Sequence, residues 1–140
     1  MAAFSKINNF VNALGQGLHN LSANTSLKAV LALTNMSAGV ETYASVVEIA
    51  AGNGYATGGL VFGSTTWSST AGTSRLKGAD VVWTASGGTI ATFQFVVIVD
   101  DKATADNLIG FWDFGTAVSI TNGNTFTVDL DPTNGILTLA

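Results

Sequence analysis

The feature that most limits the fold is a series of short apolar or alternating segments that begins after residue 59. Gly, Asn, Asp and Pro separate these segments, most clearly at residues 86–88, 122–124 and 131–135, and such residues favour tight turns. Short strands at this spacing, without helices between them, predict an all-β fold, either a jelly roll or an antiparallel β-sandwich. The predicted strands occupy residues 60–67, 74–77, 80–85, 89–99, 108–114, 117–120, 125–130 and 135–139.

Two patterns within this series support strands rather than helices. Residues 92–95 and 125–128 alternate polar and apolar side chains, as half-solvated antiparallel strands do. An earlier run, residues 27–34, is short and apolar and lies between polar residues, which is typical of a buried strand.

The N-terminal residues have the period of a helix instead. Phe4, Ile7, Val11 and Leu14 are spaced by three or four residues, so in a helix they share one face. Glycine follows at position 15, and a glycine costs about 1 kcal/mol in a helix interior. We therefore predict a short N-terminal helix at about residues 2–14. Its apolar face is expected either to cover one end of the sandwich or to dock on another subunit.

The rest of the chain is predicted to complete a single domain of residues 1–140, with the sandwich at about residues 16–140. Residues 42–48 are compatible with one or two helical turns, with Ser45 and Glu48 spaced as a weak capping box. Residues 51–59 contain four glycines around Tyr55 and are predicted to form a loop with positive φ angles.

Composition restricts the partners of the protein. Charged residues make up only 10% of the chain, compared with about 25% in an average soluble domain. Because interface cores are depleted in charge, this low content favours permanent assembly, although a plain viral or extracellular β-protein with a Ser/Thr-rich surface also fits.

The net charge of −4 is unsuited to binding nucleic acid, and no apolar stretch approaches the roughly 18–20 residues of a membrane span. No cysteine is present, so disulfides and cysteine-based zinc sites are excluded.

A search for catalytic groups finds little. His19 is the only histidine and has no nucleophile motif beside it; we expect it to be a hydrogen-bonded residue near the join between helix and strand. Asp113 lies between aromatic residues, and the two-residue period of a strand allows it to reach solvent. Asp100, Asp101 and Asp106 offer oxygen ligands for Ca²⁺, but their spacing does not match an EF-hand, and a solvated turn is favoured. We expect neither enzyme activity nor a cofactor.

Aromatic residues leave one binding function open. The tryptophan and tyrosine side chains of this chain are able to line a sugar-binding face. However, aromatic residues of β-sandwiches more often fill the core or protein interfaces. A carbohydrate-binding β-sandwich module on a virion surface or fibre is therefore the alternative function. These tryptophans and tyrosines are Trp67, Trp83, Trp112, Tyr43 and Tyr55.

Several blocks spread over nearly the whole chain resemble small virion proteins of tailed phages, the capsid cement (decoration) proteins of short-tailed bacteriophages. The resemblance is carried by Phe4-Ser5-Lys6-Ile7-Asn8-Asn9-Phe10, Leu18-His19-Asn20-Leu21, residues 27–35, residues 48–55 with Gly58-Gly59, Leu108-Ile109-Gly110-Phe111-Trp112-Asp113-Phe114-Gly115, residues 123–128 and Asn134-Gly135-Ile136-Leu137.

This resemblance implies a jelly-roll structural protein of the virion, on the capsid exterior. Such a protein binds the outside of an icosahedral capsid and stabilises contacts between major capsid protein subunits. Its implied partner is the phage major capsid protein. Other copies of itself, as a dimer or trimer, are a further expected partner, because closed symmetry is the usual arrangement of oligomers. The resemblance brings no catalytic, cofactor or metal residue with it.

Overall fold

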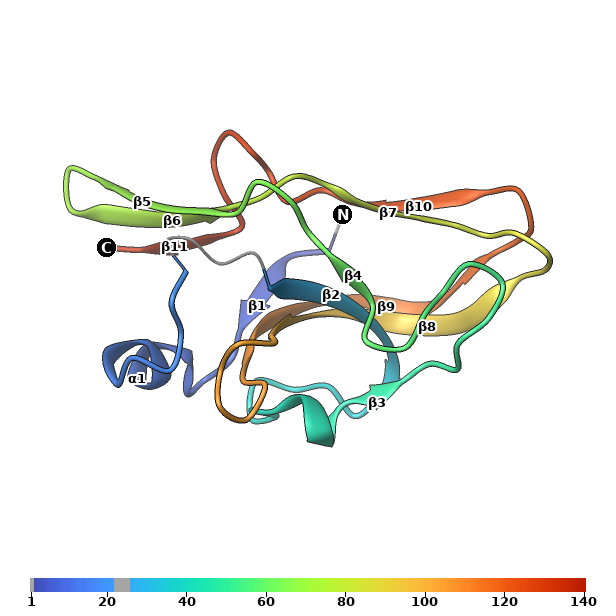
Figure 1. Ribbon diagram of the computed structural model, residues 1–140, viewed down its shortest axis with the longest axis horizontal. Helices are drawn as coiled ribbons and strands as arrows, with labels where there is room; N and C mark the ends of the chain where they lie inside the picture. The colour runs from blue at the N-terminus through green and yellow to red at the C-terminus, as the bar shows by residue number, and fades with distance from the viewer. Residues whose placement is uncertain (1, 22–25) are drawn as a thin grey trace.

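The computed structural model describes residues 2–21 and 26–140 and consists of two layers of antiparallel strands (Figure 1). One layer is a six-stranded sheet, and the other contains a three-stranded and a two-stranded sheet that follow one another along the upper side of Figure 1. Within the described residues, the α-helical part is one short helix at an end of the sandwich. The all-β antiparallel sandwich predicted from the sequence is confirmed.

Three long strands form the centre of the six-stranded sheet. The strand order is β1-β9-β8-β2-β3, and β4 pairs with the same side of β2 as β3 does. Residues 95–99 of β8 are all buried, and most are β-branched, which suits a strand with neighbours on both sides. The strands are β1 (Phe4–Lys6), β2 (Leu27–Thr34), β3 (Val47–Glu48), β4 (Leu60–Val61), β8 (Ile90–Asp100) and β9 (Leu108–Ile120).

Five shorter strands form the opposite layer. The three-stranded sheet has the order β11-β6-β5, and β7 pairs with β10 in the two-stranded sheet. These strands are β5 (Thr66–Thr70), β6 (Thr73–Lys77), β7 (Val81–Thr84), β10 (Thr125–Val128) and β11 (Leu137–Leu139).

Aromatic side chains join the two layers. Trp83 of β7 and Phe93 of β8 are almost fully buried, and both contact Phe126 of β10, with ring centroids 6.4 and 5.0 Å apart. Each buried ring stabilises the fold by about 2–3 kcal/mol. The hydrophobic core is therefore shared by both layers.

The N-terminal helix is shorter than the sequence predicted. Phe4–Lys6 form strand β1, which pairs with residues 110–112 of β9, and helix α1 spans only Phe10–Gly15. The ring of Phe4 lies 4.9 Å from that of Trp112, and Gly110 leaves room for it, because a Cβ there would collide with Phe4. Strand pairing and ring burial therefore override the helical period. No helix in the described ranges is long and apolar enough to cross a membrane.

Several other strand and turn boundaries differ from those predicted, each for a local reason. The predicted strands 108–114 and 117–120 form one strand, β9, which continues through Gly115 at φ 76°. The predicted strand 60–67 is divided into β4 and the start of β5. Only residues 43–45 form a helical turn, a 3₁₀ turn, while Glu48 lies in β3, so the predicted capping box is wrong. The loop at residues 51–59 has the expected positive φ angles.

A two-residue turn joins β5 to β6. Its central residues, Ala71 and Gly72, have φ values of 50° and 81°, as in a type I′ hairpin turn. Alanine is unfavourable in this left-handed region because its Cβ approaches the following carbonyl oxygen. The turn therefore retains local strain at Ala71.

Replacing Ala71 by Asn, which tolerates this conformation, is expected to raise the free energy of unfolding by about 1 kcal/mol. Gly72→Ala is the matched control and should lower it by a similar amount, since a Cβ at Gly72 has open space and only the backbone conformation opposes it. Urea denaturation of both variants measures the two effects. An Ala71→Asn variant less stable than the original protein would contradict the turn conformation.

Candidate protein interface

The four residues predicted to share one helix face lie in three different places. Phe4 is in β1, Ile7 is in the following connection, and Val11 and Leu14 are in α1. Ile7 is buried, and Phe4 and Leu14 pack partly buried against the core. Val11 alone of the four is exposed, at 48%. The prediction of one continuous helix face is therefore wrong, and three of its members cover this chain's own core.

His19 and Asp100 form a buried pair next to Phe10 of helix α1. His19 Nδ1 lies 2.9 Å from Asp100 Oδ2, and both side chains are at most 1% exposed. When Asp100 is ionised, its carboxylate only accepts, and Nδ1–H is then the donor. The other carboxylate oxygen, Oδ1, accepts the backbone N–H of Lys102. The sequence predicted a hydrogen-bonded His19 near the join of helix and strand, and the structure shows this hydrogen bond. Since His19 follows α1 and Asp100 ends β8, the pair also ties the N-terminal segment to the main sheet.

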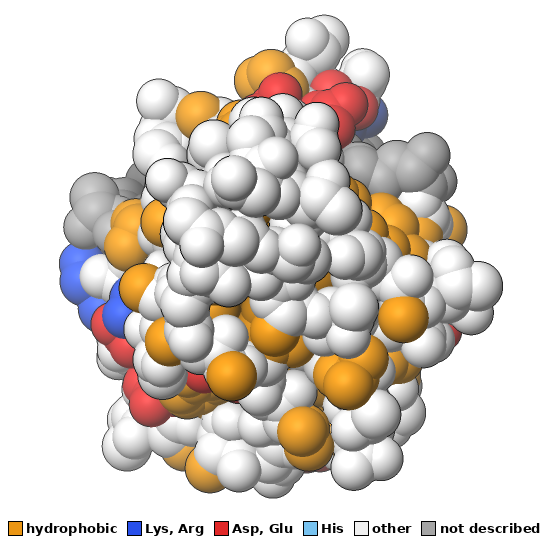
Figure 2. Space-filling view, turned by 90° about the vertical axis from the view of Figure 1, so that its right-hand side faces the viewer, with side chains coloured by type: hydrophobic (Ala, Val, Ile, Leu, Met, Phe, Trp, Pro, Cys, Tyr) orange, Lys and Arg blue, Asp and Glu red, His pale blue; other side chains and the backbone are white. Residues whose placement is uncertain are grey.

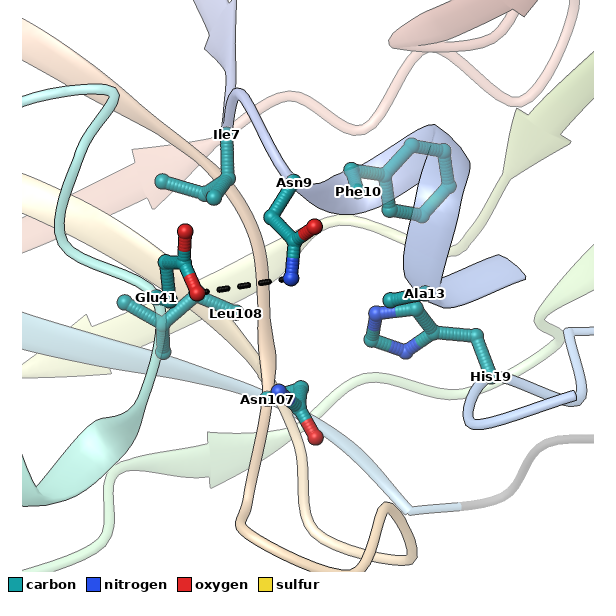
Figure 3. Close-up of a pocket in the computed structure, with 8 residues that line it drawn as sticks. All are labelled: Ile7, Asn9, Phe10, Ala13, His19, Glu41, Asn107 and Leu108. Carbon is teal, nitrogen blue, oxygen red and sulfur yellow. Dashed lines mark hydrogen bonds between the residues drawn. The ribbon is translucent and has the colours of Figure 1, made fainter. Parts of the chain in front are cut away.

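A small hollow lies beside this pair. Figure 3 shows the His19 ring facing it across from Asn9 and Glu41, whose side chains are joined by a hydrogen bond of 3.3 Å from Asn9 Nδ2 to Glu41 Oε2. No part of this hollow is wide enough for a water molecule. It therefore offers no room for a substrate beside His19.

The acidic loop does not assemble as an ion site. Asp100 is occupied by His19, Asp101 Oδ2 lies 2.8 Å from Lys28 Nζ, and Asp106 turns the chain at φ 48°. Among the described residues, no three His, Cys, Asp or Glu side chains lie close enough together to hold a metal ion. The structure therefore lends no support to the Ca²⁺ hypothesis.

Asp113 reaches the surface of β9, as the strand period predicted. It accepts hydrogen bonds from Gln94 Nε2 at 2.9 Å and from the backbone N–H of Gly115 at 2.7 Å. Both bonds are exposed. Its hydrogen bond to Gly115 N holds the backbone of β9 at the residue with positive φ, where the register with β8 is irregular.

The aromatic residues considered for sugar binding lie mainly inside the protein. Trp83, Trp112 and Tyr55 are at most 3% exposed, and Trp67 and Tyr43 are half-buried against the core. They do not form an exposed aromatic platform of the kind that stacks on sugar rings.

The Tyr55 hydroxyl, held by the Glu48 carboxylate, helps to close the outer edge of β2. Between the pairings with β3 and β4, the backbone N–H of Leu31 donates to the Tyr55 hydroxyl at 3.1 Å, and its carbonyl accepts from Ile49 N. Tyr55 in turn donates to Glu48, which also accepts from the hydroxyl of Tyr43 and from Gly58 N. The edge is therefore satisfied within the chain.

These contacts change the acidity of both tyrosines. Burial and the hydrogen bond to Glu48 raise the pKa of Tyr43 to about 12. The same two causes raise the pKa of Tyr55 further above its usual value near 10. Both phenols therefore stay protonated in the folded protein at pH values where unfolded tyrosines ionise.

Three loops meet at the end of the sandwich opposite α1 (Figure 1). We call residues 51–59, 85–89 and 121–124 the loop end. Asn53 links the first two loops, because its carbonyl accepts from Ser86 N at 2.9 Å and its Nδ2 donates to the Thr89 carbonyl at 2.7 Å. Asn122 Oδ1 accepts from Gly87 N at 3.0 Å and links the last two. The loop end is thus a cross-linked unit.

Glycine permits this close arrangement. The tight turn at Asn53 and Gly54 has two positive φ values, 55° and 104°, and a Cβ on Gly54 would collide with the Thr84 carbonyl oxygen. The sequence prediction of a turn at this place is confirmed.

The loop end carries no charged side chain. Residues 49–74, 81–99 and 114–128 contain no Asp, Glu, Lys or Arg, and these runs include all three loops. Figure 2 shows this end of the molecule, with hydrophobic side chains exposed between polar ones and charged side chains gathered toward the margins. Two exposed apolar residues, Leu60 and Val61, directly follow the first loop. Depletion of charge is a property of protein interface cores.

Comparisons with models of protein families, with curated proteins and with solved structures find no match to this chain.

Sequence reasoning missed two features of this surface. The three charge-free runs are visible in the sequence, but only the fold shows that their loops meet at one end. The hydrogen bonds from Tyr43 and Tyr55 to Glu48 connect three residues that form no recognisable sequence motif. Neither feature was predicted.

Raising the pH from 9 to about 12 is expected to destabilise the protein through Tyr43. The unfolded state loses the phenolic proton near pH 10 and the folded state near pH 12, so in this window the unfolded state binds fewer protons and the free energy of unfolding falls. Tyr43→Phe should make this fall shallower. Urea denaturation measured over this range compares the two proteins, and lysine titration is common to both. If the free energy of unfolding fell equally steeply with pH in both proteins, the raised pKa of Tyr43 would be contradicted.

Proposed function

We propose that the protein is a structural virion protein, a cement protein that binds the outside of an icosahedral bacteriophage capsid. In this role it stabilises contacts between major capsid protein subunits and acts without catalysis. The observation that carries the proposal is the loop end, a charge-free and internally hydrogen-bonded surface. The resemblance of sequence blocks to phage cement proteins supplies the identity of the partner.

Two costs of association are low at such a surface. No charged group has to lose its hydration when a partner covers it. The loops are already cross-linked through Asn53 and Asn122, so less conformational entropy is lost on binding than with flexible loops. Both effects favour docking of this end onto another protein.

The same surface suits an assembled partner. A cement protein that contacts two neighbouring shell subunits binds the assembled shell more tightly than free subunits, and this shifts the assembly equilibrium toward the shell. Each contact needs only modest affinity, because many copies act on one shell. The small size of the chain is compatible with this repeated use.

The proposal predicts that a charge placed on the loop end prevents capsid binding. Thr57 is exposed in the first loop, and Thr57→Lys would bury an unpaired ammonium group in the interface, which should weaken binding at least about tenfold. Gln16→Lys is the control, since Gln16 is exposed beside α1 at the other end of the sandwich. It should bind like the original protein.

The measurement is co-sedimentation with shells that lack the protein, followed by counting bound copies per shell subunit. Saturable binding of the original protein and Gln16→Lys, with loss of binding for a folded Thr57→Lys variant, is the expected result. If the folded original protein stays in the supernatant, the cement function is refuted. If Thr57→Lys binds as well as Gln16→Lys, the loop end is not the docking surface.

A further inference from the structure

Among the strands that stand at the end of a sheet order in the part of the chain that the structure describes, β5 is the longest. It pairs with β6 on one side, and in the order β11-β6-β5 it is the last strand. The edge strands β1, β3, β4, β7, β10 and β11 have two to four residues, while β5 has five. An unpaired edge of this length presents backbone donors and acceptors to other chains.

This edge lacks the usual protection. Natural proteins place lysine, proline or inward-pointing charges on edge strands to prevent pairing. Residues 66–70 are Thr-Trp-Ser-Ser-Thr, and no charged residue or proline occurs between residues 49 and 74. By contrast, β1 contains Lys6, and Asp80 and Asp129 lie next to β7 and β10. The edge of β2 is closed by Tyr55.

The turn geometry indicates which backbone groups are free. In a two-residue turn, the residues on either side, Thr70 and Thr73, form a hydrogen-bonded pair. Such pairs alternate along an antiparallel ladder, so the backbone groups of Thr66, Ser68 and Thr70 point toward β6. Those of Trp67 and Ser69 point outward.

The outward edge is complementary to itself. If two copies of β5 pair antiparallel about Ser68, Trp67 of each copy forms a hydrogen-bonded pair with Ser69 of the other. Thr66 then lies opposite Thr70, and Ser68 lies opposite its own copy. Thr–Thr pairs are favourable across strands, and the absence of charge on β5 avoids like-charge repulsion. A two-fold interface requires such self-complementarity.

We propose that β5 is a homodimer interface, in which the three-stranded sheets of two copies join through antiparallel β5–β5 pairing about Ser68. The partner is a second copy of this chain. The inference is independent of the capsid function, because the pairing forms in solution without a shell and leaves the loop end, at the other end of the sandwich, uncovered.

The interface is small, so the dimer is weak. Five paired residues bury less than the roughly 1,200–2,000 Å² of a stable interface. We expect the apparent mass to rise from the monomer value of 14.3 kDa toward twice that value as the protein concentration increases from about 10 µM to about 1 mM.

Opposite charges at Ser68 provide the test. Ser68→Lys and Ser68→Glu each place like charges opposite one another, so each variant alone should dimerise at least about fivefold more weakly at low salt. An equimolar mixture should recover dimerisation, since lysine then faces glutamate. Sedimentation equilibrium measures all three samples, and rescue in the mixture excludes misfolding as the cause.

Ser119→Lys and Ser119→Glu are the matched controls, because Ser119 is an exposed strand residue of β9, in the opposite layer. They should dimerise like the original protein, alone or mixed. A protein that stays monomeric up to about 1 mM would overturn the proposal. So would a dimer unaffected by the Ser68 substitutions, or one that the mixture fails to restore, since the two strands would then pair elsewhere or bind another partner.

Discussion

The pairing of β2, β8 and β9 is the interaction on which the rest of the structure depends. β8 pairs with β2 from Leu27–Asp100 to Ala32–Phe95 and with β9 along most of its length, and residues 95–99 between them are buried. This apolar centre gives the opposite layer a surface to pack on. The buried His19–Asp100 pair fixes the N-terminal segment to the end of β8, so the helix and β1 are also held by this sheet.

The sequence predicted the parts of the fold that local patterns determine. The strand at Leu27–Thr34 was placed correctly to the residue, because an apolar run between polar residues has one favourable environment. The β-sandwich and the glycine-rich turn at Asn53 were also predicted. The helix at residues 2–14 was not correct, since Phe4 gains more from packing on Trp112 in a strand than from a helical face. Contacts between distant segments, such as Glu48 with Tyr55, have no local signal.

The candidate surfaces illustrate the same limit. The runs without charge are plain in the sequence, but a one-dimensional pattern does not tell a buried run from an exposed one. Only the three-dimensional fold distinguishes the buried charge-free runs from the exposed ones. Residues 95–99 are in the core, the loop end gathers exposed parts of all three charge-free runs, and β5 forms an open edge. By contrast, the edge of β2 is closed by Tyr55 and Glu48. Low charge therefore occurs in three settings in this chain: the core, the loop end that we propose as a docking surface, and the β5 edge that we propose pairs with a second copy.

We propose that the loop end is the surface that meets the capsid. A cryo-electron microscopy reconstruction of shells saturated with this protein tests it most directly, because the fitted sandwich gives the orientation of every loop. The account predicts that the loops containing Asn53, Gly87 and Asn122 lie against the shell, while α1 points away from it. Density in which α1 contacts the shell and these loops face solvent would contradict the account.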